Sequence, residues 1–175
     1  LAIPSKYEEY AALGNVTFHA TDKLDVTGGV RYAHNEQQQE QIGSGLLIGA
    51  VPLRRDCDSV PTYLANIRYR VNDNFMPYLR FPTGYRTGGP NAVLNDLNGQ
   101  PLALPTFDDD RLTSYEAGIK FGSVDRRFNA DISVYHVDWK DMQITAIRNA
   151  LGVIANAAKA QSQGVEMTLT ALPVR

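Results

Sequence analysis

A serine, a histidine and an aspartate lie within six residues of one another, and together they are the side chains of a hydrolytic triad. Ser133, His136 and Asp138 occupy the stretch DISVYHVD. On a strand, successive side chains point to opposite faces, so Ser133 would face away from the other two. Hydrolytic triads also collect their members from distant segments of a chain. We therefore expect no catalytic site here.

The other groups with metal-binding chemistry lack the spacing that a metal site needs. The histidines His19, His34 and His136 form no pair such as H-E-x-x-H. The three aspartates at 108–110 lack the glycine and final glutamate of a calcium loop, so we expect a solvated acidic loop. Cys57 is the single cysteine, which excludes an internal disulfide, and its aspartate neighbours disfavour a reactive thiolate. We expect no metal, no cofactor and no enzymatic activity.

The composition describes a folded chain with no sign of nucleic-acid binding. Of 175 residues, 43% are apolar and 21% are charged, which is typical of a folded protein. The net charge is −2, and the 17 lysines and arginines are scattered without forming a basic patch. No stretch approaches the roughly 18 uncharged apolar residues of a membrane helix. The first residues, LAIPSKYEEY, lack the features of a signal peptide. A membrane-spanning strand remains compatible with the pattern.

A repeat divides the chain into hairpins. Asp22, Asp73 and Asp125 each lie in a short polar turn, and they are 51 and 52 residues apart. An aromatic residue stands four positions before each aspartate. These aromatic residues are Phe18, Tyr69 and Phe121. Around each of them, apolar and polar residues alternate with the period of two that is typical of a strand.

The alternation predicts seven antiparallel strands. They cover residues 10–20, 24–36, 62–71, 75–86, 112–122, 128–140 and 163–171. Long connections rich in glycine, proline, asparagine and aspartate join the hairpins at 37–60, 87–111 and 141–161. Short turns therefore lie at one end of the sheet and long loops at the other.

The alternation alone does not decide which face is buried, because a soluble sandwich and a membrane barrel differ only by exchange of inside and outside. Two features favour the membrane. Strands of about 11 residues, at about 3.3 Å each and tilted by about 45°, cross the roughly 25 Å of an apolar band. The three aromatics match a ring at a membrane boundary, on one face and at one level. Charged residues should lie on the opposite, lumen-facing side. These are Arg68, Glu116, Lys120 and Glu166.

Several consecutive motifs resemble one known family. The stretches YLRFPTGYRTGGPN and LTSYEAGIKF are followed by RRFNADISVYHVDWKDMQI and NAAKAQSQGVEMTLTALP. In this order they resemble the C-terminal barrel strands of TonB-dependent outer-membrane receptors of the siderophore-receptor type. NVTFHATDKLDVTGGVRYAHNE is similar to an earlier hairpin of the same barrel. The resemblance implies an all-β, antiparallel up-and-down transmembrane barrel of about 22 strands. Residues 1–175 would supply about a third of it, without the plug domain, the TonB box and the final strand.

The glycine-rich end of YLRFPTGYRTGGPNA is where we place the candidate ligand site. The strand that includes Tyr85 would reach the extracellular rim, where Gly88 and Gly89 would supply backbone angles that other residues resist. Ferric siderophores, the ligands that the resemblance implies, are commonly anionic, and arginine and tyrosine offer charge-assisted and stacking contacts. The candidate substrate-binding residues are Tyr85, Arg86, Asn91 and Arg148.

The resemblance further implies an energy-coupled receptor in the outer membrane of a Gram-negative bacterium. Its ligand would be a ferric siderophore or a similar scarce compound, and the TonB complex would act on it through the plug. Two alternatives stay open: a soluble β-sheet binding module with its apolar face inside, and a passive porin-like barrel without a partner. Because an open sheet leaves two unpaired edges, we expect the isolated chain to aggregate in water.

Overall fold

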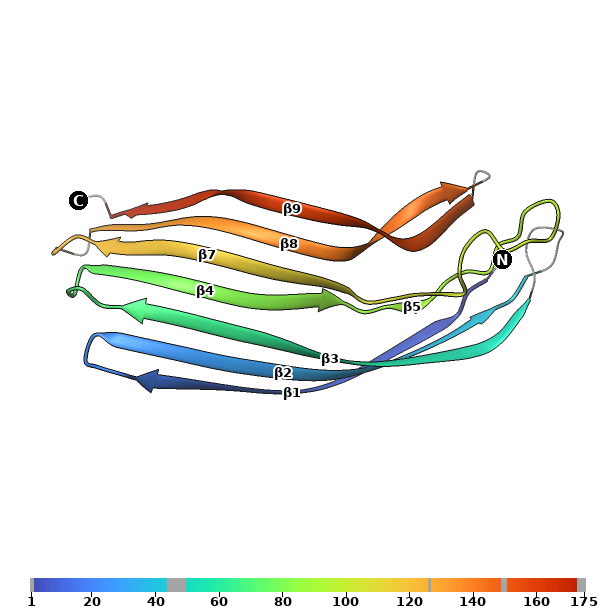
Figure 1. Ribbon diagram of the computed structural model, residues 1–175, viewed down its shortest axis with the longest axis horizontal. Helices are drawn as coiled ribbons and strands as arrows, with labels where there is room; N and C mark the ends of the chain where they lie inside the picture. The colour runs from blue at the N-terminus through green and yellow to red at the C-terminus, as the bar shows by residue number, and fades with distance from the viewer. Residues whose placement is uncertain (1, 44–49, 126, 149–150, 173–175) are drawn as a thin grey trace.

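The computed structural model describes residues 2–43, 50–125, 127–148 and 151–172, which form one long, curved antiparallel sheet (Figure 1). Its strands lie side by side in chain order. They are β1 (Ser5–His19), β2 (Leu24–Gln41), β3 (Val51–Tyr69), β4 (Phe75–Arg86), β7 (Asp110–Gly122), β8 (Phe128–Arg148) and β9 (Leu151–Ala171). Two further strands, β5 (Gly89–Pro90) and β6 (Thr106–Phe107), form a short ribbon between β4 and β7. The predicted all-β, up-and-down antiparallel fold is confirmed.

The hairpins β2–β3 and β8–β9 are longer than the sequence indicated. Two of the predicted loops, 37–60 and 141–161, are mostly strand: Gln39 still pairs with Arg54, and Arg148 pairs with Leu151. Their residues 44–49 and 149–150 lie outside the described residues. The prediction was wrong because polar runs such as QQQEQ were taken for loops. Beyond an apolar band both faces of a hairpin meet water, so the backbone ladder continues without any apolar alternation.

One face of the sheet is apolar across all its long strands. A row of directly opposed residues crosses the sheet, and every member is apolar. The row is Phe18, Val26, Ile67, Leu79, Ala117, Val134 and Val165. Most of these side chains are exposed, Val165 at 69%. Within the described residues no second sheet packs on this face, so the soluble sandwich is wrong for this part of the chain.

The three aromatics near the turns lie on this apolar face. Phe18 belongs to the row itself, whereas Tyr69 lies two residues nearer the turns than Ile67, and Phe121 lies four residues nearer than Ala117. The offset therefore grows by two residues for every two strands. Tilted strands need such a stagger to bring residues to one height, as in a barrel. We expected the three aromatics to lie at one height, and the growing offset is the stagger that tilted strands need for this.

The opposite face is polar, and hydrogen bonds join its neighbouring strands. Asp25 on β2 accepts from Arg68 at 3.2 Å and from Arg70 at 3.0 Å. The Tyr78 hydroxyl on β4 donates to Glu116 on β7 at 2.6 Å. All four charged residues that were predicted for this face lie on it. They are Arg68, Glu116, Lys120 and Glu166.

Two glycines on the polar face lie beneath tyrosine rings of the neighbouring strand. Gly118 is opposite Tyr78, and Gly164 is opposite Tyr135. A Cβ atom at Gly118 would lie 2.5 Å from Tyr78 Cζ, and one at Gly164 would lie 2.8 Å from the Tyr135 hydroxyl oxygen. Each ring thus covers backbone that the glycine leaves bare, a pairing that stabilises strands containing glycine.

The buried apolar core lies at the loop end of the sheet. Leu94 and Leu102, from the connection between β4 and β7, pack with Val153 of β9. Mid-strand residues of the apolar face are instead exposed, such as Val16 at 74%. Within the described part of the chain, no helix is long and apolar enough to cross a membrane.

Candidate ligand site at the loop end of the sheet

Tyr85 lies where β4 separates from β3. Their ladder ends at the pair Leu64 and Pro82, and proline has no N–H to continue it. The hydroxyl of the next residue, Thr83, takes over by accepting from the Tyr63 N–H at 2.7 Å and donating to the Tyr63 carbonyl at 3.3 Å. Freed from β3, the end of β4 brings Tyr85 toward the polar face of β2.

The Tyr85 hydroxyl joins a cluster of polar groups from β1 and β2. It accepts from Asn35 Nδ2 at 3.2 Å and from an Arg31 nitrogen at 3.4 Å. Arg31 also forms an ion pair with Glu9. The Tyr7 hydroxyl is 2.7 Å from both Asn35 Oδ1 and a Glu9 carboxylate oxygen. Because it has a single proton, it donates a hydrogen bond to one of them at a time. Asn35 is only 2% exposed, whereas Tyr7 is 50% exposed, so Asn35 is the buried member of a cluster that is partly open to its surroundings.

Arg86, the last residue of β4, is held by a buried carboxylate. Its Nε donates to Asp110 Oδ2 at 2.9 Å, and a terminal nitrogen makes a second contact with the same oxygen. That nitrogen also donates to the Gln143 carbonyl at 3.1 Å, and the guanidinium lies 4.7 Å from the centre of the Trp139 ring. The guanidinium is therefore fixed on several sides.

Asp110 is 1% exposed, and its charge is stabilised by hydrogen bonds. Burial alone would raise its pKa, but the bonds from Arg86 and from the Gln143 N–H bring the pKa below its ordinary value. The bond to Asp110 in turn raises the pKa of Arg86. The expectation of a solvated acidic loop at 108–110 is wrong for Asp110. The error arose because its cationic partner is 24 positions away in the sequence.

The connection of residues 87–109, which we call the strap, folds back over the polar face and is fastened to β9. Asn91 Nδ2 donates to the Ile154 carbonyl at 2.6 Å, and Asn91 Oδ1 accepts from the Ile154 N–H at 3.4 Å. Asn156 makes the same reciprocal pair with the backbone of Asp108, at 2.8 and 2.9 Å. Asn91 is 5% exposed, so it lies inside this junction.

The strap is also fastened to β2, near the other side of the sheet. Gln41 donates to the Val93 carbonyl at 2.8 Å and accepts from the Val93 N–H at 2.9 Å. Gln37 donates to the Gly88 carbonyl. Residues 91–93 thus touch both β2 and β9. The strap crosses the polar face at the loop end of the curved sheet, which we call the mouth.

Gly88 and Gly89 are required for close packing and not for unusual backbone angles. A Cβ atom would lie 2.5 Å from the Phe107 carbonyl oxygen at Gly88, and 2.4 Å from Gln37 Oε1 at Gly89. Among the described residues, the glycine with positive φ is Gly99, at 78°. The predicted reason for the two glycines was therefore wrong, although their place at the end of β4 was correct.

The structure brings three of the four candidate residues to this mouth. Tyr85 and Arg86 end β4, and Asn91 lies in the strap that follows. Arg148 is the last residue of β8, and its side chain lies outside the described residues. Sequence reasoning missed Asn35 and Asp110, whose partners are 50 and 24 positions away. No local pattern could have shown these pairs.

The side chains that suggested other chemistry are not assembled for it. Ser133 is on the polar face opposite Gly118, while His136, three residues further along the same strand, is on the apolar face. Among the described residues, no group of three or more histidine, cysteine, aspartate or glutamate side chains is placed to hold a metal ion. Cys57 is exposed and free.

Comparisons with known proteins agree on one family. The model of the family described as TonB dependent receptor-like, beta-barrel matches residues 3–172. The pesticin receptor of Yersinia enterocolitica (serotype O:8 / biotype 1B) is 28% identical over 161 residues, which are 91% of this chain and 23% of that receptor. The chain thus spans about a quarter of the length of such relatives.

Solved structures show the same fold. The ferric yersiniabactin uptake receptor FyuA from Yersinia pestis matches with a TM-score of 0.74 at 23% identity, over 94% of this chain and 24% of that one. The ferripyoverdine receptor of Pseudomonas aeruginosa, bound to ferripyoverdine, matches with a TM-score of 0.68 at 17% identity, over 99% and 22%. The chain belongs to the TonB-dependent receptor-like β-barrel family and is part of the wall of an outer-membrane barrel.

Proposed function

We propose that the protein containing this chain takes up a scarce ligand, a ferric siderophore or a similar chelate, across the outer membrane with energy from TonB. The relatives' names support this function, because they include a pesticin receptor and receptors for ferric yersiniabactin and ferripyoverdine. The observation that carries the proposal is the family match over nearly the whole chain. Residues 1–175 are on this view a partial barrel, and TonB acts through a plug that they do not include.

On this proposal the loop end faces the outside of the cell, the short turns face the periplasm, and the polar face lines the lumen. A ligand entering from outside meets the strap and the cluster beneath it first. The strap narrows the mouth from the inside, since it crosses from β2 to β9. A receptor gains from such a fixed wall, because binding then orders fewer groups and loses less entropy.

The four candidate residues remain our proposed ligand region. Two of them are proposed to contact the ligand, and two are proposed to position the wall around it. Tyr85 is half-buried at the edge of the cluster and offers a ring and a hydroxyl. Arg86 and Asn91 are engaged by Asp110 and Ile154, which supports a role in positioning the wall. Arg148 stays a predicted contact on the tip of the β8–β9 hairpin.

Uptake by intact cells tests the proposal. Cells that lack their own siderophore receptors would express the full-length protein and be offered a panel of ferric siderophores labelled with radioactive iron. We expect TonB-dependent accumulation of at least one of them. Equal accumulation in cells without TonB would favour the passive porin, and accumulation of none of the panel would contradict an iron-chelate ligand.

A paired set of variants tests the site itself. Tyr85→Ala should weaken binding of the accepted chelate while the barrel still folds. Tyr63→Ala is the matched control, because Tyr63 is exposed on the apolar face. If both variants bind like the unmodified receptor, Tyr85 is not a ligand contact.

A further inference from the structure

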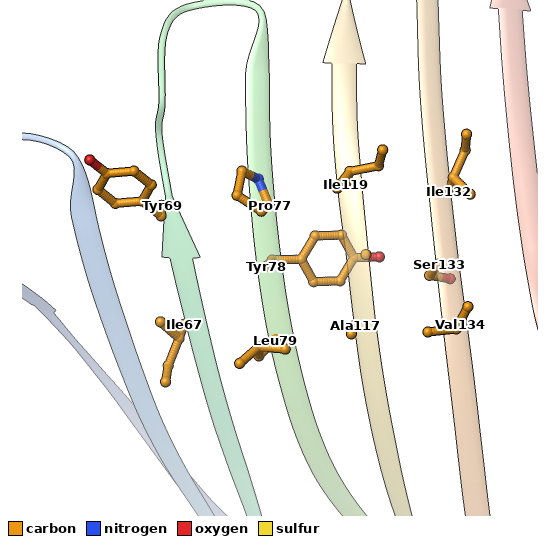
Figure 2. A pocket seen from close by; sticks show the side chains of 11 residues that line it. Ile67, Tyr69, Pro77, Tyr78, Leu79, Ala117, Ile119, Ile132, Ser133 and Val134 are labelled. Atoms are coloured by element: carbon orange, nitrogen blue, oxygen red, sulfur yellow. The ribbon is translucent and has the colours of Figure 1, made fainter.

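A pocket of about 340 Å³ lies at the loop end, between the strap and the part of β9 near Ile154. It differs from the hollow in Figure 2, which lies on the apolar face of the sheet and is lined by side chains such as Leu79 and Val134. Lipid covers the apolar face in an outer-membrane barrel, whereas the loop end is open to ligands that arrive in water. Ligand pockets begin at about 300 Å³, so the pocket at the loop end is large enough for part of a small molecule. We call it the strap pocket.

Most of the strap pocket is lined by apolar side chains. Leu102 of the strap and Val153 of β9 are buried, at 8% and 2% exposure, and they pack together in the core. Phe107 of β6 is partly buried, and Leu104 is 77% exposed. The pocket therefore combines a fixed apolar floor with an exposed leucine. An apolar group of a ligand that covered this leucine would remove apolar surface from water, which is favourable.

One carboxylate stands beside this apolar lining. Asp108 is exposed, and its carboxylate forms no ion pair with a described residue. Its backbone, by contrast, is fixed, because the Asn156 carboxamide accepts from the Asp108 N–H at 2.8 Å and donates to the Asp108 carbonyl at 2.9 Å. Asn156 also donates to the Asp141 carbonyl at 2.8 Å. The pocket thus presents a negative charge from a backbone position that is already ordered.

The described lining of the strap pocket contains no lysine or arginine, and two arginines near the end of the strap are neutralised. Arg86 is paired with Asp110, and Arg111 is paired with Asp109 at 2.9 Å. Among the described residues, an anion in the pocket would therefore meet the repulsion of the Asp108 carboxylate and no free cation. A cation in the same place would be attracted to this carboxylate. The charge of the pocket thus favours a ligand group that is apolar along its length and positive at its end.

We propose that the strap pocket takes an alkyl arm of the transported chelate, and that this arm ends in an ammonium group. The methylenes lie on Leu102, Leu104 and Val153, and the ammonium donates to the Asp108 carboxylate, as a lysine side chain would. A ferric trihydroxamate with a free amine fits this chemistry, because three singly charged hydroxamates balance the trivalent iron and the ammonium leaves the chelate cationic. The proposal rests on the proposed uptake function and names the chemical class of its ligand. It departs from the anionic ligand that we expected from the sequence.

Three forms of one chelate test the proposal on the purified full-length receptor. Ferrioxamine B is a ferric trihydroxamate whose free arm ends in an amine, acetylation of this amine makes the chelate neutral, and succinylation makes it anionic. Titration calorimetry measures the dissociation constant of each form. We expect ferrioxamine B to bind roughly tenfold more tightly than the acetylated form, because it gains one charge-assisted hydrogen bond. The succinylated form should bind least tightly, and added salt should reduce the differences.

Three variants assign the effect to the strap pocket. Asp108→Asn keeps the backbone bonds to Asn156 and should bind ferrioxamine B and its acetylated form equally tightly. Leu104→Ala should weaken both forms and leave their ratio unchanged. Asp22→Asn is the matched control, because Asp22 is exposed in a short turn at the opposite end of the sheet.

Two kinds of failure are distinguishable. Equal binding of the amine and acetylated forms, tightest binding of the succinylated form, or an unchanged preference in Asp108→Asn would overturn the proposal. Binding of none of the three forms would also overturn it, and the uptake function would still stand if cells accumulate iron from another chelate. Accumulation from no chelate at all would instead contradict the uptake function.

Discussion

The carboxamide of Asn91 takes the place of a neighbouring strand for one residue of β9, because it bonds both backbone groups of Ile154, at 2.6 and 3.4 Å. β9 is the last strand of the described sheet. At Ile154 the strap therefore supplies hydrogen-bond partners on the side of β9 that faces away from β8.

Replacing Asn91 should loosen this junction without unfolding the barrel. Asn91→Ala removes two hydrogen bonds of about 1 kcal/mol each, so amide exchange at Ile154 should rise roughly tenfold or more. Hydrogen–deuterium exchange of the intact receptor, read by mass spectrometry, measures the change. Asn98→Ala, at an exposed position of the strap, is the control. Unchanged exchange at Ile154 would mean that other contacts hold the strap.

Gly118 should tolerate no side chain. In Gly118→Ala the new Cβ would meet the Tyr78 ring at 2.5 Å, and we expect the free energy of unfolding to fall by about 1–3 kcal/mol. Urea unfolding of the receptor in lipid vesicles measures this difference. Gly28→Ala is the matched control, since no atom lies within 4 Å of its added Cβ. Equal midpoints for the two variants would show that the Tyr78 ring moves aside freely.

The Arg86–Asp110 pair should make the mouth sensitive to acid. Because the pKa of folded Asp110 is below its ordinary value of about 3.9, the stabilisation is fully present above about pH 4. It is lost as the pH falls through the folded-state pKa. The difference in melting temperature between the receptor and its Asp110→Asn variant should be constant at neutral pH and shrink below about pH 4. A difference that grows on acidification would contradict this assignment.

Spin labels should distinguish the two faces. Labels at Val26 and Ile67 should be accessible to oxygen dissolved in lipid, whereas labels at Thr27 and Asn66 should be accessible to a water-soluble nickel chelate. Each label is introduced in a receptor whose native cysteines, including Cys57, have been replaced. The pairs are neighbours in the ladder and differ only in face. Equal accessibility at all four positions would remove the argument for a membrane wall.

The isolated chain of residues 1–175 should not form a well-behaved monomer in water. Its apolar face, the outer side of β1 and most of the outer side of β9 have no neighbouring strand in the described sheet, so association with other copies is expected. Sedimentation after refolding without detergent measures the size, and thermal unfolding measures cooperativity. A uniform monomer that melts cooperatively would show that the apolar face finds a partner inside the chain.

The sequence by itself determined the strands, their antiparallel order and their two faces. The period-two alternation around Phe18, Tyr69 and Phe121 is a local property, because each residue's face depends only on its position along its own strand. The polar turns at Asp22, Asp73 and Asp125 are equally local. For this reason the central parts of all seven strands agree with the sequence.

Only the tertiary structure decided where the strands end and what the strap does. The hairpins continue beyond the apolar band through backbone bonds, which leave no trace in side-chain type. Asn91 is 63 positions from Ile154, and Tyr85 is 50 positions from Asn35. Such pairs form because the sheet curves and the strap folds back. With the strap extended, Asn91 would be a solvated loop residue without its bonds to Ile154.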